Sequence, residues 1–230
     1  MCGRYVRRGE LALFAERFDF LLNLPTPPSC NIAPTNLADV VRVEEGQRRH
    51  YQIVWGFLPV WAKDTKTRTI NARSETVHES KMFKPSLQKR RCLILADGII
   101  EWQTLGKKKL PHLFTLKGDR PFAFAGLWNR TRIGEESHES CAILTTEPNA
   151  LFARIHNRMP VVLQDNAIAP WLDAEITDVD ALRTLLVPYP AEEMTSVMIS
   201  PKINNARYKD ADGLTPTESD TTVQGDLFTV

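Results

Sequence analysis

The sequence contains few of the residues that would assign it to a specialised class of protein. Its four cysteines, Cys2, Cys30, Cys92 and Cys141, show no CxxC spacing and do not cluster with the five histidines, which argues against a zinc site or a disulfide framework. No apolar signal segment or membrane-spanning run is present. With a net charge of +1, any basic site must be local. We therefore expect a cytoplasmic protein with no metal or organic cofactor and no membrane contact.

The composition is otherwise typical of a globular protein. Charged residues make up 25% and hydrophobic residues 43% of the 230 residues, and this length fits one domain with or without a tail. From Lys209 onward the chain is polar and acidic, so it cannot bury enough apolar surface to fold alone. We predict a folded domain over residues 2–208, a disordered acidic tail over residues 209–230, and a monomer.

The spacing of apolar residues predicts a mixed secondary structure. It indicates an amphipathic helix over residues 10–20, and Ser74 is placed to cap a short helix over residues 75–80. Further helices are expected over residues 166–172 and 179–186, and strands over residues 37–43, 47–55, 91–96, 99–103, 113–116, 122–127, 140–145, 159–163 and 195–199. Because the strands follow one another without alternating with long helices, the pattern favours an α+β fold with largely antiparallel sheets.

The start of the chain carries a distinctive chemical group. Methionine aminopeptidases remove Met1 when a small residue follows, which would leave Cys2 with a free α-amine beside its thiol. The amine has a pKa of ~7.7–8.0 and the thiol one of ~8.5, so both are reactive near neutral pH. Such a 1,2-aminothiol attacks an aldehyde to form a Schiff base, which the thiol closes to a five-membered thiazolidine. The alternative is that Cys2 is only a small apolar residue near a terminus.

Three other segments place polar groups where core packing does not require them. Asn71 begins a segment through Glu75 that follows a strand end, although this could be an ordinary loop. Glu101 stands among apolar residues, where burial would raise its pKa and suit proton transfer, unless it lies on a solvated face. His156 precedes a strand close to Arg158; histidine is the natural acid–base group near pH 7, but a lone histidine is more often structural.

Seven short motifs occur in a fixed order along the chain. They are Met1-Cys2-Gly3-Arg4-Tyr5, Asn31-Ile32-Ala33-Pro34, Trp55-Gly56-Phe57-Leu58-Pro59-Val60-Trp61, Asn71-Ala72-Arg73-Ser74-Glu75-Thr76, Met82-Phe83-Lys84-Pro85, Asp97-Gly98-Ile99-Ile100-Glu101-Trp102 and His156-Asn157-Arg158-Met159-Pro160. In this order the chain resembles the SOS response-associated peptidase (SRAP) family, also called abasic site processing proteins. The resemblance runs from Cys2 to about Pro201 and implies a single domain with a barrel-like core of twisted sheets and peripheral helices.

The resemblance implies a covalent DNA-repair chemistry. Family members recognise abasic sites in single-stranded DNA and join them through the N-terminal cysteine as a thiazolidine, which shields the strand from cleavage. By motif, Cys2 is the nucleophile and Asn71 holds the Cys2 backbone or the sugar. Glu101 shuttles protons on the amine and the Schiff base, and His156 protonates the sugar ring oxygen and assists reversal.

The same resemblance implies a set of DNA-binding residues. Phosphate contacts are expected from Arg4, Arg73 and Arg158, which would fix register without reading sequence. Stacking or wedging contacts are expected from Pro34 and Trp61, and further contacts come from the motif that holds Met82 and Lys84. Ala62 stands where some members have a second tryptophan, which puts part of the stacking surface in doubt. The basic run has two interpretations, a phosphate-binding strip or a solvated helix face, and it comprises Lys81, Lys84, Lys89, Arg90 and Arg91. Residues 107–109 are expected to be a soluble hairpin turn.

Two other functions remain open from the sequence. One is a cysteine peptidase with an N-terminal nucleophile, which would use the same residues and could be restricted to self-processing. The other is a non-covalent reader of damaged or modified DNA, which would tolerate Cys2→Ala.

The predicted tail holds one further motif. Gln224-Gly225-Asp226-Leu227-Phe228 resembles the pentapeptide with which bacterial proteins bind the sliding clamp, with Gln224, Leu227 and Phe228 as anchors. We hypothesise that it recruits the protein to replication forks at the nucleoid; the alternative is an ordinary tail that matches by chance.

Overall fold

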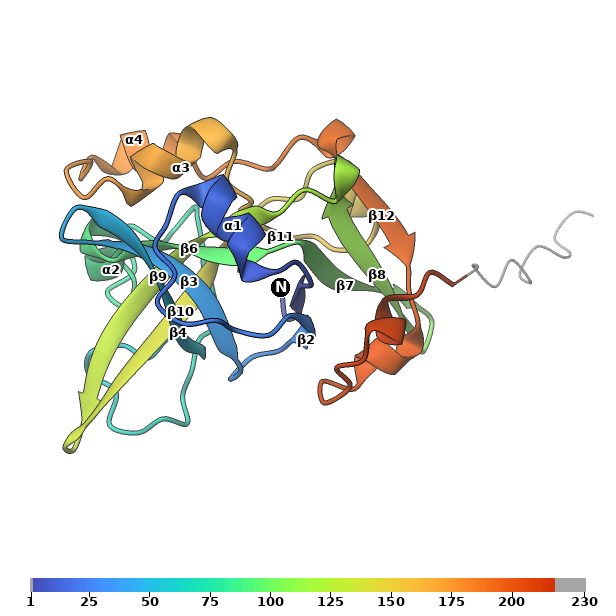
Figure 1. The fold of residues 1–230 in the computed structure, drawn as a ribbon, viewed down its shortest axis with the longest axis horizontal. Helices are drawn as coiled ribbons and strands as arrows, with labels where there is room; N and C mark the ends of the chain where they lie inside the picture. Colours follow the sequence, from blue (N-terminus) through green and yellow to red (C-terminus); the bar gives the residue numbers. More distant parts are fainter. Residues whose placement is uncertain (1, 218–230) are drawn as a thin grey trace, which may run out of the picture.

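A computed structural model describes residues 2–217, which fold around two β-sheets with helices at the periphery (Figure 1). The main elements are β1 (Tyr5–Arg7), α1 (Leu11–Phe18), β2 (Ser29–Ile32), β3 (Leu37–Glu44), β4 (Gln47–Trp55), β5 (Asn71–Arg73), α2 (Lys84–Lys89), β6 (Arg91–Ala96), β7 (Gly98–Leu105), β8 (Lys108–Leu116), β9 (Phe122–Ile133), β10 (Glu136–Thr146), β11 (Met159–Pro160), α3 (Asp165–Leu172), α4 (Val179–Thr184) and β12 (Met194–Met198). Short 3₁₀ helices include η2 (Phe152–Arg154), η4 (Pro201–Asn204) and η5 (Ala211–Leu214). The clamp-binding candidates Gln224, Leu227 and Phe228 lie outside the described residues.

Five strands of the larger sheet close into a barrel. Antiparallel pairs join β4 to β3, β3 to β6, β6 to β9 and β9 to β10, and a short parallel pair between β10 and β4 completes the ring. Closure leaves these strands without free edges along the paired segments. The predicted α+β class, largely antiparallel sheets and barrel-like core are confirmed, whereas the parallel closing pair was not foreseen.

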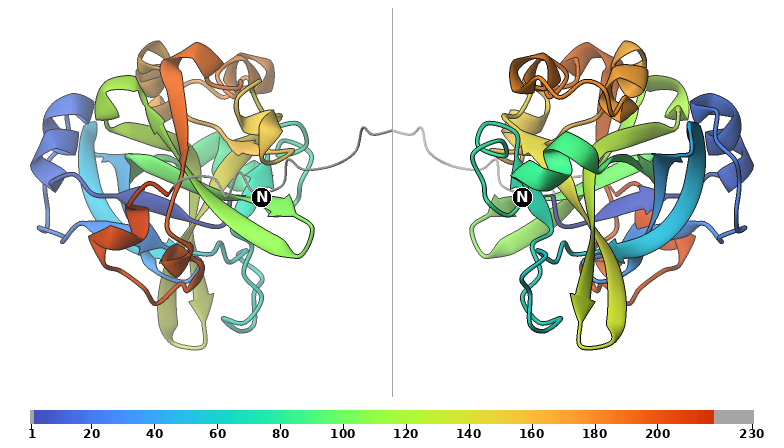
Figure 2. Two further views of the ribbon diagram at one scale, coloured as in Figure 1. Left: turned by 90° about the vertical axis from the view of Figure 1, so that its right-hand side faces the viewer. Right: turned by 90° about the vertical axis from the view of Figure 1, so that its left-hand side faces the viewer.

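The barrel strands bury both of their faces because side chains alternate along a strand. In β6, Cys92 and Ile94 belong to an inner cluster to which all five barrel strands contribute, whereas Leu93 and Leu95 belong to an outer cluster. The outer cluster also contains buried side chains of α1, α2, α3 and α4. Figure 2 shows α3 and α4 together at one end of the molecule, while β9 and β10 extend as a long ribbon at the other. The barrel thus provides a rigid core between the helices and the second sheet.

The second sheet has the strand order β12-β8-β7-β1-β2 and packs against the barrel. Tyr5 in β1 makes this contact, because its ring meets Trp55 and Phe124 of the inner cluster at centroid distances of 5.2 and 5.6 Å. Aromatic pairs at such distances prefer edge-to-face contacts of this kind. The start of the chain is therefore fixed against the interior of the barrel.

Two sequence-based expectations about local structure are wrong. The chain over residues 74–79 forms consecutive turns in place of the short helix expected after Ser74. Residues 209–217 were expected to begin the disordered tail, but they pack on the domain: Leu214 is buried in η5, and Pro216 forms a β-bridge with Ile199. The folded domain therefore extends past the predicted boundary, because a few apolar side chains in this polar stretch find an existing surface to cover.

Within residues 2–217, no helix is both long enough and apolar enough to cross a membrane. In the same range, no group of three or more His, Cys, Asp or Glu side chains is arranged to hold a metal ion.

Candidate active site

Cys2 lies just before β1 and is held by a neighbour from the barrel sheet. Its side chain is fully buried, and Asn71 Nδ2 donates a 2.8 Å hydrogen bond to its carbonyl oxygen. Asn71 begins β5, which pairs with β10 at Ile143 and so rests on the barrel. Burial raises the pKa of the Cys2 thiol, and the nearby charge of Glu101 raises it further, so the sulfur is a neutral thiol. The structure therefore joins two residues that the sequence placed in one site.

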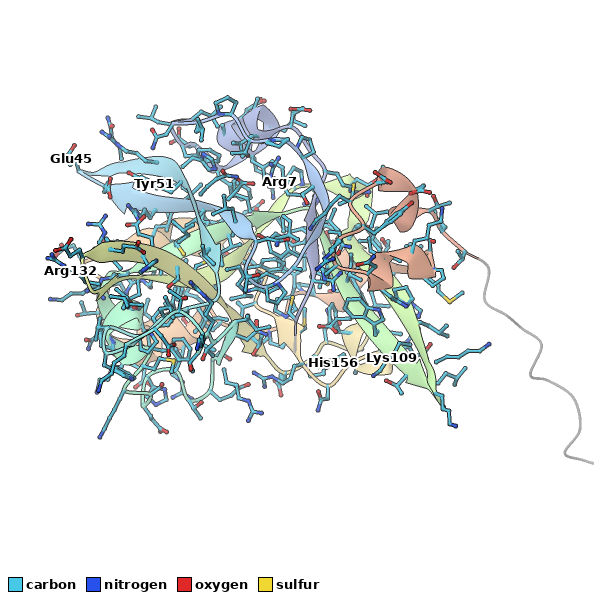
Figure 3. All side chains as sticks on the ribbon, turned by 90° about the horizontal axis from the view of Figure 1, so that it is seen from below. Arg7, Glu45, Tyr51, Lys109, Arg132 and His156 are labelled. Atoms are coloured by element: carbon cyan, nitrogen blue, oxygen red, sulfur yellow. The ribbon has the colours of Figure 1, made fainter. Side chains whose placement is uncertain are left out.

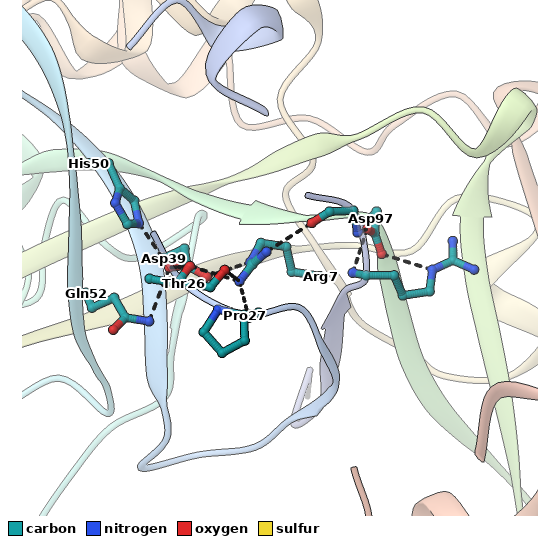
Figure 4. A network of polar contacts seen from close by, with 9 residues as sticks. Arg7, Thr26, Pro27, Asp39, His50, Gln52 and Asp97 are labelled. Atoms are coloured by element: carbon teal, nitrogen blue, oxygen red, sulfur yellow. Dashed lines mark hydrogen bonds and ion pairs between the residues drawn. The ribbon is translucent and has the colours of Figure 1, made fainter. Parts of the chain in front are cut away.

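The other end of β1 is anchored by a buried polar network (Figure 4). Arg7, which is 1% exposed, donates from Nε to Asp39 Oδ2 at 2.6 Å and from Nη2 to Thr26 Oγ1 at 2.9 Å. Asp39 also lies 3.0 Å from Nε2 of the buried His50. A buried charge keeps such partners in place because losing one leaves the other unpaired. This network fixes β1 and hence the position of Cys2.

Glu101 is a buried acid on the strand next to β1. It lies in β7 with only 3% of its surface exposed, and no described residue forms a hydrogen bond with its Oε1. Burial raises the pKa of Glu101 to about 7. A carboxyl group with a pKa near neutrality can both accept and release a proton at physiological pH. The expectation of burial for Glu101 is confirmed, and the solvated-face alternative is excluded.

Glu101 opens onto a cleft that also contains His156. The cleft has a volume of about 560 Å³ and is lined by Arg4, Glu101, Trp102, Lys109, His156 and Asn204. His156 Nδ1 lies 3.0 Å from the backbone nitrogen and 2.9 Å from the carbonyl oxygen of Arg158, which orients the ring. Burial lowers the pKa of His156, and the charges of Lys109 and Arg158 lower it further, so the imidazole is neutral at pH 7. Figure 3 shows His156 and Lys109 side by side.

Three residues of this cleft were not identified from the sequence. Lys109 was assigned to a soluble hairpin turn, yet it lies in the cleft wall. Trp102 follows Glu101 directly, and the Arg4 guanidinium lies over its ring, with the guanidinium carbon 5.4 Å from the ring centroid. Its place in the same motif as Glu101 could have identified it from the sequence. Asn204 accepts a 2.6 Å hydrogen bond from Trp102 Nε1, and no feature of its surroundings in the sequence pointed to the site.

Asn204 belongs to a strap, residues 200–209, whose helix η4 contacts β8 and which is hydrogen-bonded to Asn31 of β2. The buried Asn31 holds the strap, because its Nδ2 lies within hydrogen-bond distance of three strap carbonyls: Ile203 (3.3 Å), Asn205 (3.1 Å) and Tyr208 (2.8 Å). Asn31 Oδ1 in turn accepts a 2.6 Å bond from Arg4 Nη1. Asn31 therefore links the motif that begins with it to the wall of the cleft.

The candidate DNA-binding residues differ in their surroundings. Arg4 lines the cleft, and desolvation lowers its pKa. Arg158 is paired with Glu75 through a 2.7 Å ion pair, close to the exposed Arg73. Among the others, Trp61 is 54% exposed, Pro34 and Met82 are half-buried, and Lys84 is exposed at the start of α2. Met82 packs against the outer core cluster, so packing accounts for part of its role.

The fold is a closed barrel with a buried cysteine at position 2, a buried acid and a histidine beside a cleft, and comparison with known proteins identifies its family. Residues 1–206 match the family described as SOS response associated peptidase (SRAP). The chain belongs to this family.

Curated relatives agree with this assignment, and a solved structure shares the fold. The chain is 38% identical to the abasic site processing protein YoqW of Bacillus subtilis, over 90% of this chain and 96% of the relative. It is 29% identical to the abasic site processing protein YedK of Escherichia coli, over 94% of this chain and 100% of the relative. A crystal structure from Bacteroides thetaiotaomicron has the same fold, with a TM-score of 0.87 at 22% identity, over 94% of this chain and 100% of that one.

Proposed function

We propose that this protein processes abasic sites in single-stranded DNA by joining the open-chain sugar aldehyde to Cys2 as a thiazolidine, after loss of Met1. The observation that carries the proposal is the juxtaposition of Cys2, fixed through Asn71, with Glu101, whose pKa burial raises to about 7. The relatives YoqW and YedK are named abasic site processing proteins, which supports the substrate class.

The proposed reaction requires only groups that the site contains. The Cys2 α-amine attacks the aldehyde carbon, and the resulting carbinolamine loses water to give an imine. The thiol then adds to the imine carbon, the nitrogen takes up the thiol proton, and the ring closes. One water is released overall, and no oxidant or reductant is needed. Ring closure removes the iminium that would otherwise promote β-elimination and strand cleavage.

Two side chains would carry the protons of these steps. Glu101 would remove a proton from the Cys2 ammonium and return it to the departing hydroxyl, which a group titrating near pH 7 does efficiently. His156 lines the same cleft and would assist opening of the sugar ring. Arg4, Arg73 and Arg158 would contact the DNA phosphates.

The test is covalent capture of single-stranded DNA that contains one abasic site. We expect the wild type and Cys30→Ala, which alters a half-buried cysteine outside the cleft, to give a band that survives denaturing electrophoresis. Cys2→Ala should give none. The intact mass of the adduct should equal that of protein without Met1 plus DNA, less one water. If the wild type lacks Met1 and forms no adduct, the proposal is wrong, and non-covalent binding or amide hydrolysis takes its place.

We also propose that the segment with Gln224, Leu227 and Phe228 binds the bacterial sliding clamp, which would bring the protein to the forks where single-stranded abasic sites arise. A pull-down with purified clamp tests this. Binding should be lost when Gln224→Ala and Phe228→Ala are combined, and equal retention of the double variant would refute the idea.

A further inference from the structure

Arg158, a candidate phosphate ligand, already holds an anion. Its Nη1 and Nη2 donate to the two carboxylate oxygens of Glu75 at 2.7 and 2.9 Å, which is a two-pronged contact of the kind that arginine makes with phosphate. The interaction with Arg158 lowers the pKa of Glu75, so the carboxylate is charged at neutral pH. Glu75 therefore occupies the place on Arg158 that a DNA phosphate would take.

The rest of the guanidinium offers no second forked edge. Arg158 Nη2 also donates to the carbonyl oxygen of Thr145 at 2.7 Å. The hydroxyl oxygen of Thr145, Oγ1, lies 3.3 Å from the same nitrogen. Nε is enclosed and has no hydrogen-bond partner among the described residues, so it is not available to a ligand from solvent. A guanidinium grips an oxyanion through a pair of neighbouring N–H groups. A phosphate can therefore accept hydrogen bonds from both Nη1 and Nη2 of Arg158 only by displacing Glu75.

Burial indicates which partner moves. The Arg158 side chain is 17% exposed and is tied to the backbone of β10 through Thr145, whereas the Glu75 side chain is 46% exposed in the turn after β5. Arg73 is near enough to contribute to the lowered pKa of Glu75. One half-exposed carboxylate thus lies close to two arginines that the proposed function assigns to phosphates.

We propose that Glu75 is a specificity-determining residue, which competes with the DNA backbone for Arg158 and so weakens the hold on strands that carry no aldehyde. This inference rests on the proposed function, because it takes Arg158 as a phosphate ligand. A strand with an abasic site is retained by its covalent bond to Cys2, and a strand without one is released. The competition therefore sharpens the difference in retention between damaged and undamaged DNA.

The experiment measures the affinity for unmodified single-stranded DNA by fluorescence anisotropy at fixed low salt. Glu75→Gln should tighten binding by about two- to fivefold, the range expected for the loss of one partly exposed ion pair. The matched control is Glu147→Gln, which removes an exposed charge from the wall of the cavity that Glu75 also lines. It should change affinity by less, because it does not release Arg158.

A double-mutant cycle with Arg158→Ala separates competition from general repulsion of DNA. The gain from Glu75→Gln should disappear when Arg158 is absent. An equal gain in both backgrounds, or weaker binding by Glu75→Gln, would overturn the inference. If wild type forms the Cys2 adduct and Arg158→Ala binds DNA less tightly while Glu75→Gln gives no gain, only this inference fails. If wild type neither binds single-stranded DNA nor forms the adduct, the proposed function fails as well.

Discussion

Glu101 couples the chemistry of the site to the stability of the fold. Burial raises its pKa from an ordinary 4.5 to about 7, so the folded protein holds this proton over a pH range in which the unfolded chain has released it. Stability falls with rising pH wherever the folded state binds more protons than the unfolded state. The contribution of Glu101 is therefore most favourable below about pH 4.5 and is lost as the pH rises through about 7.

Glu101→Gln should consequently be more stable than the wild type at high pH. The pKa change corresponds to roughly 3 kcal/mol, an order-of-magnitude value for a buried group. We expect urea unfolding to give similar midpoints for both proteins at pH 5 and a higher midpoint for Glu101→Gln at pH 8.5. Glu135→Gln, at an exposed position, should follow the wild type throughout. A difference between wild type and Glu101→Gln that does not vary with pH would contradict this account.

The sequence identified most catalytic candidates because their motifs are local, but it could not give their partners. The residues next to Glu101 in the sequence did not decide whether its side chain is buried or exposed. In the structure, the register of β7 turns the Glu101 side chain inward, where it is buried. The contact between Glu75 and Arg158 joins residues far apart in the chain, and neither motif alone implies it. Charge pairing of this kind depends on the tertiary fold.

At the scale of elements, the strap over residues 200–209 completes the cleft, and Asn31 holds it together with Arg4 and Trp102. Asn31 is buried and bonds to three strap carbonyls, while Ile203 of the strap is fully buried beside Val6 and Ile100 of β1 and β7. Ile203 O also accepts a 3.0 Å bond from Arg4 Nη1, but removing the Asn31 amide leaves the carbonyls of Asn205 and Tyr208 without this donor, which costs about 1–3 kcal/mol for an unsatisfied polar group. The loss should be local because the barrel makes no use of these bonds.

Asn31→Ala should therefore loosen the strap without unfolding the barrel. We expect hydrogen–deuterium exchange to speed up in peptides covering residues 200–209, while peptides from β6 and β9 keep their protection. Asn23→Ala is the control, since Asn23 Nδ2 also donates to a backbone carbonyl, that of His50, at 2.8 Å and away from the strap. Unchanged exchange in the strap would show that its other contacts, such as those of Arg4 with Ile203 and Trp102 with Asn204, hold it without Asn31.

Elements with strong local patterns were predicted well. The strand predicted over residues 47–55 has those bounds in the structure, and the helix predicted over residues 10–20 is α1. The helix expected after Ser74 failed because the chain there is directed by contact with β10, where the Ser74 nitrogen donates to the carbonyl oxygen of Thr145 at 2.9 Å. Helix α2 was only an open alternative, as a solvated helix face at Lys84 and Lys89, because it is short and Pro85 in its first turn is the main signal.

At the scale of the whole molecule, closure of the barrel decides which side chains fit inside. The closing pair joins β4 to β10 in parallel, and several other strands separate the two in the chain. No local sequence pattern therefore predicts this pairing. Once the ring closes, the inner positions of neighbouring strands come close together. Gly126 in β9 faces the inner side of β6, and an added Cβ would lie 2.8 Å from Cys92 Sγ and 2.8 Å from Ile94 Cγ1.

Gly126→Ala should therefore destabilise the protein by overpacking, at a cost of about 1–3 kcal/mol. The residue does not adopt a positive φ, so the cost comes from the neighbours and not from the backbone. Shrinking both neighbours, with Cys92→Ala and Ile94→Ala, should recover stability when combined with Gly126→Ala, even though that pair alone leaves a cavity and destabilises the protein. Urea unfolding of the four proteins measures this coupling. A simple sum of the two losses would mean that the barrel relaxes around Gly126, whereas recovery in the triple variant would show that the closed ring of strands sets the inner packing beneath the site.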